Sequence, residues 1–166
     1  MSEQTSQSLS QLSPAERKLL QLSIHINAML VANADGSYSM RETVALAEAV
    51  RKLISEEQYR PLLLVAGSEP ISDAAVRVFL EEHSTDVEGY LQRVSQLLKS
   101  LPEEAAEAYR RFTLYSIVAV AEASRAGLFG LMGDRISSSE KKVMKRMVEL
   151  LELPLDDGTR AKLGMG

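Results

Sequence analysis

Apolar residues recur along most of the chain at spacings of three and four, and strict alternation of apolar and polar residues is hard to find. The first spacing gathers apolar side chains on one face of an α-helix, whereas alternation is typical of a half-buried strand. The pattern therefore predicts an all-α protein, and we expect a bundle of about seven helices.

Helix-start signals divide the chain into these helices. The pattern Ser-X-X-Glu, in which the serine and the glutamate each bond the other's backbone N–H, occurs at Ser13–Glu16, Ser39–Glu42 and Ser137–Glu140. Pro102 followed by two glutamates also marks a helix start, because proline and acidic residues suit the first turn. We expect helices over residues 13–32, 39–53, 56–66, 73–83, 86–99, 102–124 and 137–151.

The length of 166 residues suits one domain, which we place at residues 13–153. Residues 1–12 are rich in Ser and Gln and form an expected flexible lead-in, and residues 154–166 form a short tail that we expect to fray. The chain start lacks the basic and apolar regions of an export signal, and no apolar run approaches the length of a transmembrane helix. These features predict a cytoplasmic protein without a transmembrane segment.

The charge balance narrows the possible partners and chemistry. The net charge is −4 and the isoelectric point is about 5.3, which argues against nucleic acid because phosphate backbones attract basic surfaces. The chain has no cysteine, so disulfides and thiolate sites are excluded. His25 and His83 are the only histidines, and no catalytic triad or HExxH motif can be assembled from them. We expect His25 to be a hydrogen-bonded core residue.

Two segments, 24–32 and 112–123, are apolar nearly all round, which is typical of helices at the centre of a bundle. Similar residues follow both segments: Tyr38, Ser39 and Glu42 after the first match Ile136, Ser137 and Glu140 after the second. The second connection is longer and carries Gly127, Gly130 and Gly133. This recurrence predicts two pseudo-repeated helix–loop–helix units.

These residues also resemble a known family. The run Ala34-Asp35-Gly36 with Glu42 seven positions after Asp35, and later a Gly-rich loop with Asp134, Ile136-Ser137 and Glu140, is similar to the tellurite-resistance TerB-like superfamily. The similarity extends over about residues 13–153. It implies a cytoplasmic bundle of about seven helices and a stress-associated binding or scaffold module, rather than an established enzyme.

The resemblance further implies a protein partner, membrane-associated or chaperone-like, and acidic residues that hold a metal ion. The second unit departs from the simpler pattern, because Ser124 stands where the first unit has Asp35 and the acidic residue Asp134 comes only at the far end of the loop. A symmetric pair of metal sites is therefore not expected.

The candidate metal ligands are Asp35, Glu42, Asp134 and Glu140. Asp35 and Glu42 fall at positions 5 and 12 of a calcium-binding EF-hand loop, but Val31 would occupy position 1 and cannot ligate. Turn formation and helix capping explain each of the four residues alone, and that explanation is favoured. Four carboxylates brought together would repel each other, and one divalent cation (Ca²⁺, Mg²⁺ or Mn²⁺) would relieve the repulsion.

Three functional interpretations stay open at this point. The first is a non-enzymatic binding module that holds one cation, the second is a metal-dependent hydrolase that uses the same carboxylates, and the third is a structural adaptor without metal. The apolar residues Leu128, Phe129, Leu131 and Met132 of the Gly-rich loop form a candidate interaction patch or a lid on the bundle. The sequence does not specify the oligomeric state.

Overall fold

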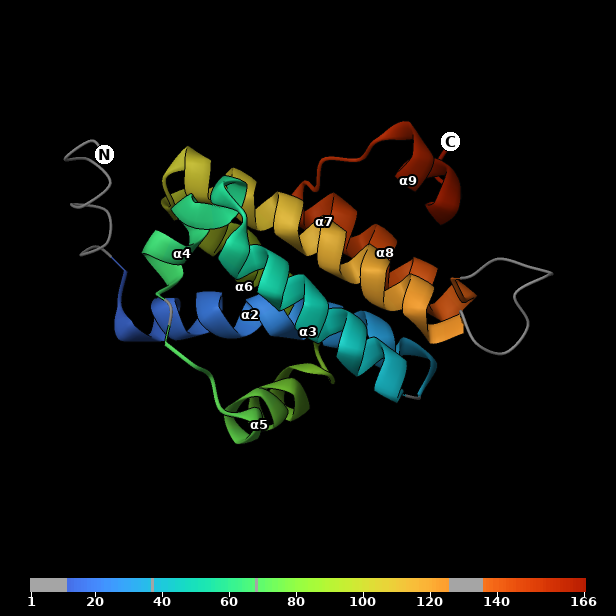
Figure 1. Ribbon diagram of the computed structural model, residues 1–166, viewed down its shortest axis with the longest axis horizontal. Coiled ribbons are helices and arrows are strands. Elements are labelled where there is room, and N and C mark those ends of the chain that lie inside the picture. The colour runs from blue at the N-terminus through green and yellow to red at the C-terminus, as the bar shows by residue number, and fades with distance from the viewer. Residues whose placement is uncertain (1–11, 37, 68, 126–135) are drawn as a thin grey trace.

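The computed structural model describes residues 12–36, 38–67, 69–125 and 136–166, and within these ranges the secondary structure is entirely helical (Figure 1). The α-helices are α2 (Pro14–Ala32), α3 (Met40–Ser55), α4 (Arg60–Ala66), α5 (Asp73–His83), α6 (Val87–Ser100), α7 (Glu103–Arg125), α8 (Ser138–Leu151) and α9 (Asp157–Leu163). Two short 3-10 helices, η1 (Asn33–Asp35) and η2 (Glu57–Tyr59), precede α3 and α4. The predicted all-α class is confirmed for the described residues.

Local sequence explains where the helices begin. Each Ser-X-X-Glu pattern forms a complete capping box, at the starts of α2, α3 and α8. Each box bonds two backbone N–H groups that a helix start otherwise leaves without partners. Six of the seven expected helices begin within one residue of the expected position, whereas α4 begins at Arg60, four residues later than expected, because the 3-10 helix η2 occupies Glu57–Tyr59.

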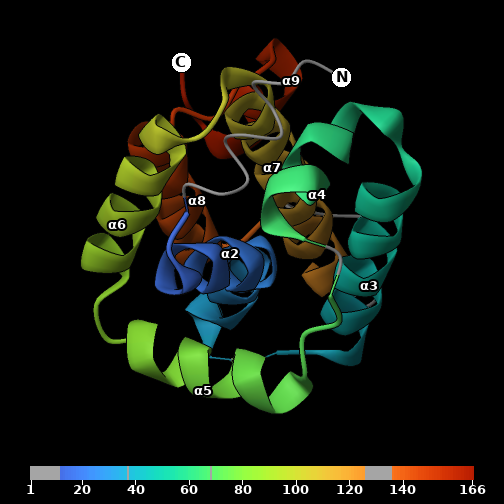
Figure 2. The same ribbon diagram turned by 90° about the vertical axis from the view of Figure 1, so that its left-hand side faces the viewer.

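The two predominantly apolar helices lie at the centre of the bundle. Helices α2 and α7 pack against each other, and Figure 2 shows α3, α4, α6 and α8 arranged around them. Helix α7 contacts α3 and α4, and α2 contacts α5, α6 and α8. This position agrees with their composition, because a helix that is apolar nearly all round must be covered on most sides.

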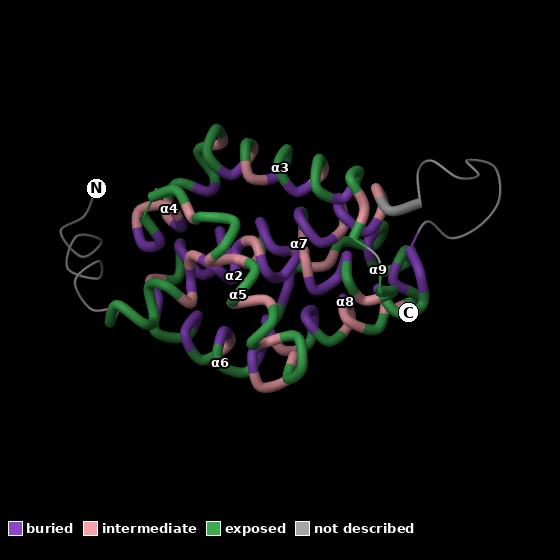
Figure 3. The backbone as a smooth tube through the Cα atoms, turned by 90° about the horizontal axis from the view of Figure 1, so that it is seen from below, coloured by how far each residue is buried: buried purple, intermediate pink, exposed green. Residues whose placement is uncertain are grey.

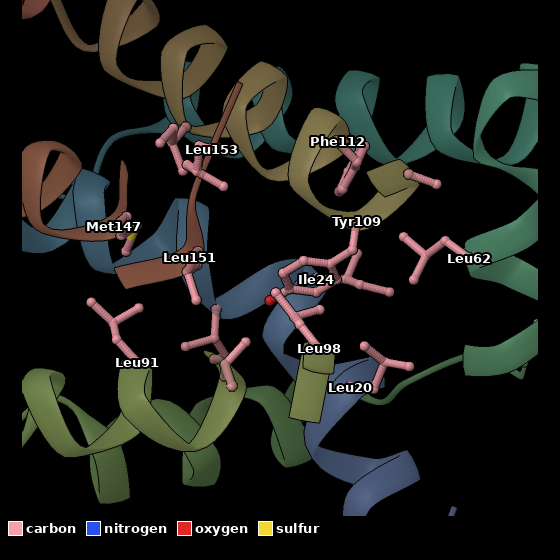
Figure 4. Packing of buried hydrophobic residues seen from close by; sticks show 14 of the residues in the cluster. Leu20, Ile24, Leu62, Leu91, Leu98, Tyr109, Phe112, Met147, Leu151 and Leu153 are labelled. Atoms are coloured by element: carbon pink, nitrogen blue, oxygen red, sulfur yellow. The ribbon is translucent and has the colours of Figure 1, made fainter. Parts of the chain in front are cut away.

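The main core lies where α2, α6, α7 and α8 converge, and Figure 4 shows their side chains pointing toward one another. Fully buried members include Leu20, Leu91, Phe112 and Met147. Each such side chain stabilises the fold by about 1.5–3 kcal/mol relative to leaving it in water. A second, smaller cluster joins α2, α3 and α7 through Ala28, Ala32, Leu46 and Val120.

Helices α3 and α5 lie at the outside of the bundle (Figures 2 and 3). Helix α3 buries one face, with Leu46, Ala49 and Leu53, and leaves much of the rest exposed. Helix α5 has no buried residue, although the Phe79 ring lies 6.1 Å from the ring of Tyr90 in the core. The fold therefore contains one peripheral helix that is lightly packed and one that is packed on a single side.

The tail differs from the sequence expectation. Residues after Pro154, which we expected to fray, contain helix α9, so the described part of the chain has eight α-helices instead of about seven. Asp156 caps α9, Leu163 is fully buried, and Lys162 Nζ donates a hydrogen bond of 2.6 Å to Glu122 Oε1 on α7. Tertiary packing stabilises this short helix, and local propensity alone does not reveal it.

Among the described residues, no helix combines the length and the apolar character that crossing a bilayer requires. Residues 126–135 connect α7 to α8 and lie outside the described ranges. The pseudo-repeat of two helix–loop–helix units therefore stays a prediction, supported by the equivalent capping boxes of α3 and α8.

Candidate functional site

The three capping boxes have the same hydrogen bonds. Backbone N–H groups of Ser13, Ser39 and Ser137 donate to Oε2 of Glu16, Glu42 and Glu140, over 2.8, 2.5 and 2.7 Å. In return, each glutamate N–H donates to the serine Oγ over 3.2–3.3 Å. By local geometry alone, the three glutamates are equivalent.

Their surroundings differ. Glu16 is exposed, whereas Glu42 and Glu140 are only 1% and 0% exposed. In both buried glutamates Oε2 bonds the backbone, but Oε1 is buried and has no hydrogen-bond partner among the described residues. A buried carboxylate oxygen without a partner is costly, because water would otherwise solvate it.

The two buried boxes lie at one end of the bundle. Figure 1 shows that α3 and α8 begin at the end where α2 and α7 finish. Helix η1, which carries Asp35, packs against α8, which carries Glu140. Asp35 itself is exposed and follows the C-terminus of α2. The structure thus brings the elements of two predicted ligands, Asp35 and Glu140, into contact.

The predicted cluster of four carboxylates is not shown. Asp134 lies outside the described residues, as does the predicted interaction patch of Leu128, Phe129, Leu131 and Met132. Within the described ranges, no three Asp, Glu or His side chains converge as a metal-ligand group. Two buried carboxylate oxygens, those of Glu42 and Glu140, are what the described structure offers to a ligand.

An oxygen of this kind accepts a proton, a hydrogen bond from water, or a hard divalent cation. In both residues the other oxygen is fixed by the N-cap backbone, which holds the carboxylate in one orientation. The buried Oε1 atoms of Glu42 and Glu140 are therefore preoriented acceptors. The chemistry fits Mg²⁺, Mn²⁺ or Ca²⁺, which all prefer oxygen ligands.

A second set of buried polar side chains lies in the middle of the bundle, and the sequence analysis did not predict it. Tyr90 OH donates to Asn27 Oδ1 over 2.8 Å, and Asn27 Nδ2 donates to Tyr109 OH over 2.7 Å. Tyr109 OH donates to Ser23 Oγ over 2.8 Å, and Asn27 Nδ2 also approaches Thr113 Oγ1 at 3.5 Å. We call these five residues the central network.

The central network is fully buried, and its side-chain polar atoms have partners. Burial raises the pKa of Tyr109 to about 12 and raises the pKa of Tyr90 well above its ordinary value. Both hydroxyls therefore stay protonated near neutral pH. The signal in the sequence is weak: Ser23 and Asn27 interrupt an apolar helix at a spacing of four, as Tyr109 and Thr113 do in α7.

The expectation for His25 was wrong. Its side chain is half-buried and has no hydrogen-bond partner among the described residues, because α2 turns it toward a groove and away from the polar centre. Burial lowers the pKa of His25 below its ordinary value. The groove has a volume of about 660 Å³ and is lined by parts of α2, α3 and α5; we call it the α3–α5 groove.

No protein-family model, curated protein or solved structure matches the chain.

Proposed function

We propose that the protein is a non-enzymatic, TerB-like binding or scaffold module that holds one divalent cation at the end of the bundle where α3 and α8 begin. Glu42 and Glu140 supply the buried ligand oxygens, and Asp35 and Asp134 are the further carboxylates that the sequence pattern adds. The observation that carries this proposal is that both buried capping glutamates keep an Oε1 without a partner among the described residues.

Burial supports this assignment over capping alone. A capping glutamate needs only one oxygen and works at the surface, as Glu16 does in α2. Desolvating the second oxygen adds a cost that capping does not require. A cation offsets that cost, since it neutralises the carboxylate and occupies the oxygen that the backbone leaves.

The same geometry bears on the choice of ion. Because Oε2 of each glutamate already accepts a hydrogen bond from the N-cap backbone, Oε1 is the oxygen left for an ion, which favours monodentate over bidentate binding. Calcium sites commonly use a bidentate glutamate and six to eight oxygens, whereas Mg²⁺ is usually bound by one or two carboxylates and several waters. We therefore expect Mg²⁺ or Mn²⁺ to bind more tightly than Ca²⁺.

Isothermal titration calorimetry with MgCl₂, MnCl₂ and CaCl₂ tests the proposal. The double variant Glu42→Gln, Glu140→Gln is suitable, because glutamine also serves in a capping box while it removes the charge. We expect binding heat for the natural sequence and its loss in the double variant. The matched control is Glu16→Gln, which alters the exposed box and should bind as the natural sequence does.

Absence of heat in the natural sequence, or equal heat in the double variant, would refute the proposal and favour a structural adaptor that only caps its helices. The hydrolase interpretation has its own test. If Glu42 and Glu140 held a catalytic metal, turnover of p-nitrophenyl phosphate with Mg²⁺ or Mn²⁺ would disappear in the double variant and persist in Glu16→Gln. We expect no turnover in the natural sequence or in either variant.

A further inference from the structure

Helix α5 packs on the outside of the bundle without a single buried residue. It lies against α2 and is joined to α4 and α6 at its two ends (Figure 2). Four of its apolar residues are only partly buried against the core: Ala75, Val76, Phe79 and Leu80. An element with so little buried apolar area opens at a lower free energy than the core does.

Three aromatic rings connect the C-terminal end of α5 to that core. Phe79 and His83 lie one turn apart on α5, and their ring centroids are 4.2 Å from each other. The ring of Tyr90 on α6 lies 6.1 Å from Phe79 and 5.4 Å from His83. Tyr90 is fully buried and belongs to the central network. His83 is therefore placed where its protonation state affects the contact between α5 and the core.

A hydrogen bond to α6 requires the neutral form of His83. Nη2 of Arg93 lies 2.9 Å from Nδ1 of His83. A guanidinium only donates, so Nδ1 accepts and the neutral ring carries its proton on Nε2. A second proton, on Nδ1, removes this acceptor and places a positive imidazolium beside the positive guanidinium. Protonation therefore replaces an attractive contact between α5 and α6 with a repulsive one.

The charges around His83 act in both directions. Burial and Arg93 disfavour the charged ring, whereas Glu82 and Asp86 favour it, and the balance lowers the pKa of His83 below its ordinary value of 6.5. In a released helix His83 is in water and away from Arg93, so it binds a proton more readily than in the docked helix. Docking is therefore fully favoured above pH 6.5 and weakens as the pH falls through that value toward the lower docked pKa.

The other histidine of the chain also faces α5. His25 on α2 lines the α3–α5 groove, as do Asp73 and Arg77 of α5, which carry opposite charges. Burial lowers the pKa of His25 as well. His25 has no hydrogen bond within the described residues to lose on protonation, whereas His83 loses its bond to Arg93. We therefore assign the larger part of the effect to His83.

We propose that α5 is a pH-sensitive switch, which docks on α2 and on the Tyr90 ring while His83 is neutral and is released when His83 binds a proton. Release opens one wall of the α3–α5 groove, because Val76 and Leu80 of α5 belong to it. The hydrogen bonds of the central network come from α2, α6 and α7, so the rest of the bundle keeps them. The result is an apolar surface that is covered near neutral pH and exposed in mild acid.

Hydrogen–deuterium exchange followed by mass spectrometry tests the proposal. Exchange is measured at about pH 7 and about pH 5, a range in which histidines titrate and most carboxylates stay charged. Correction for the intrinsic exchange rate gives a protection factor for each helix. We expect the protection factor of α5 to fall by at least about twofold more than those of α2 and α6, because acid releases α5 alone. EDTA in both buffers keeps the result independent of cation binding.

Two substitutions separate the charge of His83 from its packing. His83→Gln keeps an acceptor for Arg93, and His83→Phe keeps a ring beside Phe79 and Tyr90, but neither new side chain binds a proton in this range. In both variants the protection of α5 should lose most of its pH dependence, whatever its value near neutral pH. The matched control is His25→Leu, which removes the other histidine and should keep most of the fall.

The comparison uses the ratio of protection factors at the two pH values, and circular dichroism near neutral pH verifies that each variant folds. Protection of α5 that does not change with pH in the natural sequence, or that falls equally in α2 and α6, would overturn the proposal. A fall that persists in either His83 variant, or one that disappears in His25→Leu, would overturn it as well.

Discussion

Two regions of this bundle bury polar side chains, and they do so in opposite ways. In the central network, Asn27 accepts from Tyr90 and donates to Tyr109, and Tyr109 in turn donates to Ser23. At the end of the bundle, Glu42 and Glu140 each bond the backbone with Oε2 and leave a buried Oε1 without a partner among the described residues.

This difference distinguishes buried polar groups with a structural role from those with a ligand-binding role. A buried polar group that has all its hydrogen bonds can be explained by folding alone, since it fixes how α2, α6 and α7 are aligned. A buried acceptor without a partner is not explained by capping, because an exposed glutamate caps a helix without that cost, as Glu16 does. On this criterion the central network is structural, and the two glutamates are the candidate ligands of the proposed cation site.

The largest expected effect is at the centre of the network. Asn27→Leu keeps the branching and the number of side-chain heavy atoms but removes the acceptor of the Tyr90 hydroxyl and the donor to Tyr109, so two buried hydroxyls each lose a hydrogen bond. We expect the free energy of unfolding to fall by about 3 kcal/mol. Urea denaturation followed by circular dichroism measures the change.

The double variant Asn27→Leu, Tyr90→Phe is the control for this prediction. Removing both partners of a buried hydrogen bond costs less than removing one, so the double variant should be less destabilised than the sum of the two single changes. Strict additivity would show that the Asn27–Tyr90 bond does not contribute, and it would weaken the contrast between the two regions.

Cation binding should stabilise the other region by a similar amount. At a free Mg²⁺ concentration 100 times the dissociation constant, the free energy of unfolding should rise by about 2.7 kcal/mol, because the ion binds only the folded chain. Glu42→Gln, Glu140→Gln should abolish this increase, and Asn27→Leu should retain it. An equal gain in the chain with both glutamates replaced would place the effect elsewhere.

Much of the fold could be predicted because its signals are local. The serine and glutamate of each capping box define helix starts within four residues, and the structure confirms all three starts. Helix α9 has a local cap at Asp156, but this seven-residue helix also depends on the buried Leu163 and on the contact between Lys162 and Glu122, which are 40 residues apart. No local pattern contains that information.

The candidate site shows the same limit more sharply. Ser13–Glu16 and Ser137–Glu140 have the same sequence pattern and the same hydrogen bonds, yet one glutamate is exposed and the other is fully buried. Burial depends on which helices pack against the box, and that depends on the whole fold. The capping pattern alone therefore does not distinguish Glu42 and Glu140 from Glu16. The recurrence and the family resemblance single out Glu42 and Glu140 as candidate ligands, but neither predicts that they are buried.

The serines of the three boxes provide a graded test of this point. Replacing an N-cap serine by alanine costs about 0.5–2 kcal/mol. We expect Ser137→Ala to lie near the upper limit and Ser13→Ala near the lower, because Ser137 is buried and Ser13 is exposed, so water replaces the lost bond only at Ser13. Ser39 is half-buried and should fall between them. Thermal unfolding of the three variants measures the order, and equal losses would show that burial does not matter here.

The smallest expected effect concerns His25, a half-buried polar group that belongs to neither region. Burial lowers its pKa below the ordinary value of 6.5, while Asp73 and Arg77 of α5 line the same groove with opposite charges. The unfolded chain therefore binds a proton more readily than the folded chain, so stability is fully present above pH 6.5 and falls as the pH drops through that value toward the lower folded pKa. His83 acts in the same direction, because burial and Arg93 lower its pKa too.

Urea denaturation between pH 5 and pH 7, a range above the usual titration of carboxylates, tests this prediction. As the pH falls, the free energy of unfolding should decrease less in His25→Leu than in the natural sequence. If the free energy of unfolding decreases equally in His25→Leu and in the natural sequence, the pH dependence belongs to His83 and the groove leaves His25 fully solvated.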